Sequence, residues 1–167
     1  MRLTNSKGDA FELQIIGYQF PHLEDEEYDS NWLQVQIQCR LNGHTWVAND
    51  PGLLTWEAEG LLKWFKKIGN QELVRYTRWN FLEPYLSFKL VSTVEGQKLW
   101  VCLRQDYRPS WAYLPYLDFD DDDFHLEFPV SEVSFDQVIN SLQAQLQKFP
   151  IRAEHLVNRR HFKFHKL

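Results

Sequence analysis

The segment WLQVQIQCRLNG, residues 32–43, decides the fold class of this chain. Its apolar and polar residues alternate strictly, as in a β-strand with one face in the core and one in water. The apolar face consists of Leu33, Val35, Ile37, Cys39 and Leu41. Asn42-Gly43 supplies a two-residue turn, because both residue types tolerate positive φ, and residues 44–49 return as the partner strand. The segment therefore predicts an antiparallel hairpin.

A helix is predicted directly after this hairpin. The pair Asp50-Pro51 is typical of a helix start, in which Asp caps the free amides and Pro occupies the first turn. Apolar residues then recur at helical spacing as far as Ile68, and Gly69-Asn70 permits the left-handed conformation that closes a helix. Gly60 lies inside this helix, where it costs about 1 kcal/mol relative to Ala. We therefore expect the backbone to pack closely against another group at Gly60.

Strands predominate in the rest of the chain. Residues 11–20, 78–83, 85–94, 98–105 and 124–128 have strand-like patterns, whereas 107–116 form an irregular loop rich in Pro and aromatic residues. Ser134-Phe135-Asp136-Gln137 matches a capping box that opens a second amphipathic helix, which Pro150 ends. The pattern predicts an α+β fold: a mainly antiparallel β-sheet of about six or seven strands with two amphipathic helices packed on it.

Length and charge predict one acidic domain with a basic end. A chain of 167 residues suits a single domain, which we expect at residues 1–150, followed by a basic C-terminal tail at 151–167. The tail has five Lys and Arg residues against Glu154, a net charge of +4. The first 150 residues therefore carry −9 in a chain whose total is −5. A body this acidic argues against direct binding to nucleic acid, because it repels phosphate.

The sequence predicts a cytoplasmic protein without membrane contact. No stretch approaches the roughly 20 apolar residues of a membrane helix, and residues 1–10 are polar where a signal peptide would be apolar. Cys39 and Cys102 lie in strand-like segments without metal-ligand spacing. We expect both to be small buried hydrophobes, with a disulfide or a reactive thiol as the alternative.

The sequence motifs that would indicate an enzyme or a metal site are incomplete or absent. The run that begins at Asp118 resembles a calcium loop, but Asp123 stands where that loop requires Gly, and Pro129 where it requires a bidentate Glu. His161 and His165 have helical spacing but no third ligand nearby. Nucleophile elbows and Gly-rich phosphate loops are absent from the sequence. We therefore expect no catalytic residue, no metal and no cofactor, although Glu57, Glu59 and Glu83 could in principle pair as acid and base.

Acidic and aromatic residues gather in two segments. Eleven of the 23 carboxylates fall within residues 24–29 and 118–127. Such clusters can steer a basic protein partner onto a surface where Trp and Tyr provide buried anchors. The alternative is that they are solvated loops, or that residues 120–123 pair with cations of the tail. The predicted partner-binding residues are Glu24, Asp25, Glu26, Glu27, Asp29, Trp111, Tyr113, Tyr116, Asp118, Asp120, Asp121, Asp122 and Asp123.

Four segments between residue 11 and about residue 104 share the features of one known family. They are Gly17-Tyr18-Gln19-Phe20-Pro21, Tyr28-Asp29-Ser30-Asn31-Trp32-Leu33, residues 46–68, and Phe81-Leu82-Glu83-Pro84-Tyr85-Leu86-Ser87-Phe88. Their most specific parts are Asp29-Ser30-Asn31-Trp32 and the Asp50-Pro51 pair. Together they resemble the WapI-type immunity proteins of bacteria. The resemblance implies a small cytosolic partner of a toxin C-terminal domain, which in the founding system is a nuclease acting on tRNA, and it implies nothing catalytic.

Two functions follow from the sequence. The first is a non-enzymatic immunity protein that binds a basic toxin domain through its acidic, aromatic-flanked loops. The alternative is a small-molecule-binding or structural domain with an aromatic-lined cleft, in which the acidic loops maintain solubility.

Overall fold

The computed structural model describes residues 1–112 and 124–160, with side chains up to Val157. Two antiparallel sheets of four strands account for its β-structure. The first sheet has the order β1 (Arg2–Thr4), β2 (Ala10–Tyr18), β3 (Trp32–Leu41) and β4 (His44–Leu54). The second has the order β5 (Arg78–Asn80), β6 (Leu86–Thr93), β7 (Gly96–Leu103) and β8 (His125–Pro129). The predicted α+β class is confirmed, and β1 is a strand that the sequence pattern did not predict.

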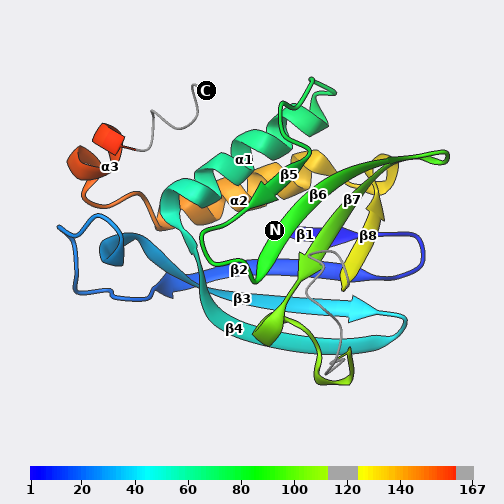
Figure 1. The fold of residues 1–167 in the computed structure, drawn as a ribbon, viewed down its shortest axis with the longest axis horizontal. Coiled ribbons are helices and arrows are strands. Elements are labelled where there is room, and N and C mark those ends of the chain that lie inside the picture. The colour runs from blue at the N-terminus through cyan, green and yellow to red at the C-terminus, as the bar shows by residue number, and fades with distance from the viewer. Residues whose placement is uncertain (113–123, 161–167) are drawn as a thin grey trace.

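Two long helices run side by side along the pair of sheets, as Figure 1 shows. They are α1 (Thr55–Gly69) and α2 (Phe135–Lys148), and a short α3 (Glu154–Arg160) follows. Helix α2 begins after Ser134, as predicted, although the Ser134 side chain makes no capping hydrogen bond. None of the helices in the described ranges is long and apolar enough to cross a membrane.

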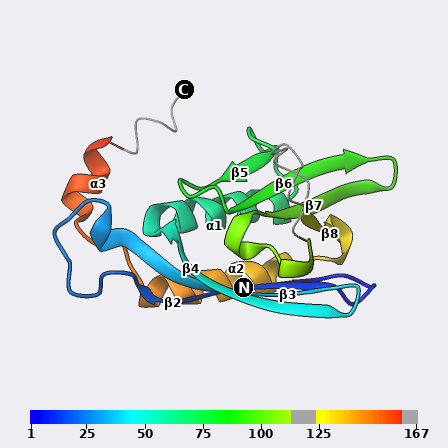
Figure 2. The same cartoon turned by 60° about the horizontal axis from the view of Figure 1, so that its bottom comes forward.

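The two sheets meet around Phe88 of β6, which is fully buried. Its ring packs edge-on against Phe11 of β2 with centroids 5.9 Å apart, and against Phe65 of α1 with centroids 5.4 Å apart. Figure 2 shows the first sheet and the second sheet on opposite sides of the molecule. A single aromatic residue therefore joins both sheets and one helix in a common core, and edge-to-face pairs of this kind stabilise a core beyond their buried area.

The hairpin predicted from residues 32–43 is confirmed. Residues Asn42 and Gly43 adopt φ of 51° and 83°, the positive values that such a turn requires. Leu33, Val35 and Ile37 are fully buried, while the polar residues between them are partly exposed. Strict alternation thus placed one face of β3 in the core.

The predicted helix start at Asp50-Pro51 is wrong. Strand β4 continues through both residues to Leu54, and α1 begins at Thr55. Pro51 is tolerated there because β4 is an edge strand and the register shifts beside its partner Gln34. The helix start is instead completed by Glu57, whose carboxylate accepts the backbone N–H of Leu54 at 2.9 Å.

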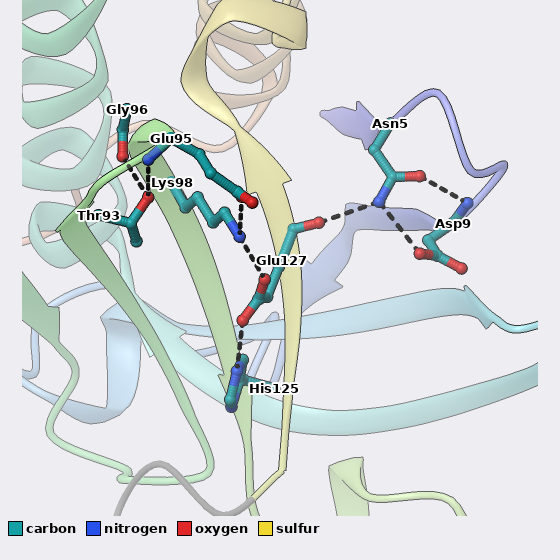
Figure 3. A network of polar contacts seen from close by, with 8 residues as sticks. All are labelled: Asn5, Asp9, Thr93, Glu95, Gly96, Lys98, His125 and Glu127. Carbon is teal, nitrogen blue, oxygen red and sulfur yellow. Dashed lines mark hydrogen bonds and ion pairs between the residues drawn. The ribbon is translucent and has the colours of Figure 1, made fainter.

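The turn between β1 and β2 is tied to the second sheet by the network in Figure 3. Asn5 Nδ2 donates to the carbonyl oxygen of Glu127 on β8 and to the carboxylate of Asp9, both at 3.0 Å. The Glu127 carboxylate lies 3.3 Å from Lys98 Nζ and 3.2 Å from His125 Nε2. Burial raises the pKa of Glu127, but its bonds to His125 and Lys98 outweigh this and lower it. Glu127 is therefore a structural carboxylate.

Candidate functional site

The predicted partner-binding residues lie in two separate places where the structure describes them. Residues 24–29, the acidic loop, lie between β2 and β3, whereas Trp111 belongs to the short helix η3 (Ser110–Ala112). Trp111 packs against Trp46 near the β3–β4 turn, with ring centroids 5.8 Å apart. Trp46 pairs with Cys39, which lies seven residues along β3 from Trp32, so the acidic loop before Trp32 is about 23 Å away at about 3.3 Å per residue. The remaining members, Tyr113, Tyr116, Asp118, Asp120, Asp121, Asp122 and Asp123, lie outside the described residues.

Asn31 holds the acidic loop in place. Its fully buried side chain donates through Nδ2 to the carbonyl oxygens of Glu27 at 2.9 Å and Arg152 at 2.8 Å. Its Oδ1 accepts the backbone N–H of Arg152 at 2.9 Å and the hydroxyl of Thr55 at 2.6 Å. A buried side-chain amide is tolerated when its donors and acceptors are hydrogen-bonded. Asn31 therefore joins the loop to α1 and to the segment after α2.

Arg152, a cation of the predicted tail, supports the same loop. Its Nη1 donates to the carbonyl oxygens of Pro21 at 3.1 Å and Leu23 at 2.7 Å. Its guanidinium lies 3.6 Å from the centroid of the Tyr18 ring, in cation–π geometry. The backbone that leads into the acidic loop is thus fixed by one cation from the C-terminal segment.

Four carboxylates from separate segments line a hollow of about 490 Å³, which we call the acidic hollow. They are Asp29 at the end of the acidic loop, Asp50 on β4, Glu83 between β5 and β6, and Asp106 on the short helix η2 (Gln105–Tyr107). None of the described residues that line it is a Lys, Arg or His. Its other lining residues are Gln19, Phe20, Trp32, Pro51 and Tyr85. Negative charge and aromatic surface therefore meet in one concave site.

The charges in the acidic hollow repel one another. Partial burial, followed by the charges of Asp106 and Glu83, raises the pKa of Asp50 above its usual value of 3.8. Within the described ranges, no side-chain hydrogen bond or ion pair compensates these carboxylates. Such a group of uncompensated charges favours a cation, because a cation relieves the repulsion. The hollow is thus electrostatically prepared for a basic ligand.

Glu57 positions one wall of the hollow. Its carboxylate accepts the N–H of Leu54 at 2.9 Å and of Leu82 at 2.7 Å, which joins the start of α1 to the loop that carries Glu83. The pKa of Glu57 is raised above its usual value, mainly by burial. The two backbone N–H groups partly offset this, and the charge of Glu83 adds to it. Glu57 therefore acts as a structural cap that joins the start of α1 to the loop carrying Glu83.

A larger groove of about 1180 Å³ lies at the other end of the second sheet, and we call it the large groove. Four carboxylates line it too, but three of them have partners, and Glu72 accepts a hydrogen bond of 3.0 Å from Asn70 Nδ2. Glu132 accepts the backbone N–H of Ser6 at 2.6 Å, and Glu95 lies 3.2 Å from Lys98 Nζ. The large groove is therefore less prepared for an additional cation than the acidic hollow.

The described ranges contain two cysteine thiols, and also side chains of the kinds that could bind a metal ion. Both cysteines are buried and free, and burial raises the pKa of Cys39 to about 12, so its thiol stays protonated. No group of three or more His, Cys, Asp or Glu side chains within residues 1–112 and 124–157 is placed to hold a metal ion.

Sequence reasoning found Asp29 but missed Asp50, Glu83 and Asp106 as members of a common site. Each is an isolated carboxylate in its own segment, and no local charge run distinguishes it. Asp50 also belongs to the pair Asp50-Pro51, which is typical of a helix start. Only the folding of β4 against β3, and of η2 beside β4, brings these residues together.

Comparison with known proteins identifies the family. A model of the immunity protein WapI-like family matches residues 2–150, which include both sheets, both long helices and all residues of the acidic hollow. Comparisons with curated proteins and with solved structures give no significant match. The matched region extends over most of the 167 residues, beyond the four segments that carried the resemblance. The chain therefore belongs to the immunity protein WapI-like family.

Proposed function

We propose that this protein is a non-enzymatic cytoplasmic immunity protein that neutralises a basic toxin domain by binding it at the acidic hollow and the adjoining acidic loop. Membership of an immunity protein family implies a toxin as the partner. The observation that carries the choice of surface is the convergence of Asp29, Asp50, Glu83 and Asp106 without a compensating cation among the described residues.

The chemistry of the hollow suits a toxin that acts on nucleic acid. Such an enzyme binds phosphates through Lys and Arg, and an acidic surface competes for the same groups. Phe20, Trp32 and Tyr85 line the hollow and offer apolar surface beside its charges. Interfaces of high affinity combine aromatic anchors with complementary charge in this way. A nuclease is therefore the toxin class that we favour.

The acidic loop extends the negative surface. Glu24, Asp25 and Glu26 are exposed, and the loop ends at Asp29, which lines the hollow. Ser30 contributes to its rigidity, because its hydroxyl accepts the N–H of Glu26 at 2.8 Å. A loop fixed in its bound form loses less entropy on binding. Asp118 and Asp120 to Asp123 remain proposed partner contacts on the basis of charge alone.

Calorimetric titration with an inactive form of the toxin domain encoded beside this gene tests the proposal. The hollow variant is Asp50→Asn, Glu83→Gln and Asp106→Asn, and we expect it to bind at least about tenfold more weakly than the unaltered protein. The matched control variant, Glu72→Gln, Glu95→Gln and Asp136→Asn, removes the same charge from the large groove. We expect its affinity to stay within about twofold. A loss confined to the control variant would place the toxin in the large groove instead.

A further inference from the structure

A groove of about 350 Å³ runs along one face of α1, and we call it the aromatic groove. Trp56, Gly60, Lys63, Trp64 and Lys67 line it at spacings of three and four residues, which place them on one side of the helix. The opposite wall comes from the segment between α1 and β5 and from β5 itself.

The floor of the aromatic groove is formed by Trp79 lying against the backbone of Gly60. A Cβ atom at residue 60 would come within 2.4 Å and 2.5 Å of two carbons of the Trp79 ring. The close packing expected at Gly60 is therefore confirmed, and it explains why a helix interior keeps glycine at a cost of about 1 kcal/mol. Trp64 Nε1 donates to the carbonyl oxygen of Tyr76 at 2.9 Å, which fixes a second ring. The aromatic surface is thus formed before any ligand arrives.

Positive charge surrounds this floor. Lys63, Lys67 and Arg75 line the groove and are exposed, and Glu59 is the one carboxylate among its lining residues. Within the described chain, no ion pair involves any of these three cations. The Arg75 guanidinium lies 5.2 Å from the centroid of the Tyr76 ring. A cationic rim above aromatic rings is thus set into a body whose net charge is strongly negative.

We propose that the aromatic groove binds a small molecule that joins a planar aromatic ring to an anionic group. The partly exposed rings of Trp79 and Trp56 offer apolar surface to the planar part, and Lys63, Lys67 and Arg75 offer charge-assisted hydrogen bonds to the anion. The volume is at the lower end of the range for small-molecule sites, which begins at about 300 Å³. The aromatic groove and the acidic hollow share no lining residue, so this proposal does not rest on toxin binding at the hollow.

Titration with 8-anilinonaphthalene-1-sulfonate tests the proposal, because this probe is itself a planar aromatic anion whose fluorescence rises on binding. We expect saturable binding to one site of the full-length protein at low salt. The double variant Lys63→Gln and Lys67→Gln should weaken it about three- to tenfold, as expected for two exposed charge contacts. N-phenyl-1-naphthylamine, which has the same rings without the sulfonate, should bind the unaltered protein and the double variant equally.

Lys66→Gln provides a control on the same helix. Lys66 lies on the same helix but contacts Gln143 of α2, with Nζ 3.2 Å from Oε1, so it faces away from the groove. Its substitution should leave the affinity for the sulfonate within about twofold. Equal affinity in the double variant and the Lys66 variant, or fluorescence that never saturates, would mean adventitious binding and would overturn the proposal. Because no toxin is present, this outcome is independent of the proposed immunity function.

Discussion

Replacing Asn31, the buried residue directly before β3, by Ala should destabilise the protein strongly. The change removes four hydrogen bonds, two donated to Glu27 and Arg152 and two accepted from Arg152 and Thr55. Each bond contributes about 1 kcal/mol net, so the sum is about 4 kcal/mol. Some of the freed groups can regain water, and we therefore expect a loss of about 3 kcal/mol. This is a large part of the stability of an ordinary domain, about 5–15 kcal/mol.

Urea unfolding followed by circular dichroism measures this loss. With a slope of about 2 kcal/mol/M, a loss of about 3 kcal/mol lowers the midpoint by about 1.5 M. Thr55→Val is the matched comparison, because it removes one of the four bonds and should cost about 1 kcal/mol. If Asn31→Ala costs no more than Thr55→Val, the amide does not join the three segments, and our account of how the acidic loop is fixed is wrong.

Two further substitutions test the packing and the electrostatics. Gly60→Ala should destabilise the protein by about 1–3 kcal/mol in urea unfolding, because the new methyl group overlaps Trp79 and this outweighs the gain in helix propensity; a more stable variant would contradict the packing. Asp50→Asn should stabilise the protein by less than about 1 kcal/mol at pH 7, a small gain because solvent screens this partly exposed site. The gain arises because burial and the charges of Asp106 and Glu83 raise the folded pKa of Asp50 above its unfolded value. Above the folded pKa, the charged form of Asp50 therefore lowers the stability of the protein. The gain in stability from Asp50→Asn should vanish as the pH falls through this folded pKa and below 3.8. A gain that persists at low pH would show that the charge of Asp50 is not its cause.

Local patterns predict the elements of this fold where one period dominates. The alternation in residues 32–41 and the Asn42-Gly43 turn identify the central hairpin, and helical spacing identifies α1 and α2. The Asp50-Pro51 pair misleads because the same residues suit either a helix start or the end of an edge strand. Pro51 stays in strand β4 because it pairs with Gln34 of the neighbouring strand β3, and local sequence does not show this pairing. Strand β1 has three residues, which are too few for an alternating pattern of apolar and polar residues to be recognised.

The candidate site is harder to predict for the same physical reason. The acidic loop is visible in the sequence because its charges are consecutive, and its last residue, Asp29, does line the hollow. Asp50 and Glu83 are 33 residues apart in the sequence, and Glu83 and Asp106 are 23 apart. Nothing in the local sequence therefore marks the three as a group. Sheet pairing and the position of η2 create the site. Arg152 likewise appears as one charge of a basic tail, and only the fold reveals its contacts with Pro21 and Leu23.

The rate constant for association with the toxin domain, measured by stopped flow from low to high salt, tests the central claim most directly. If the acidic hollow steers a basic partner, the hollow variant Asp50→Asn, Glu83→Gln and Asp106→Asn should associate about tenfold more slowly at low salt. Its rate should also depend less on salt, while the control variant Glu72→Gln, Glu95→Gln and Asp136→Asn follows the unaltered protein. Equal rates and equal salt slopes for the two variants would contradict the assignment of the hollow as the toxin-binding site.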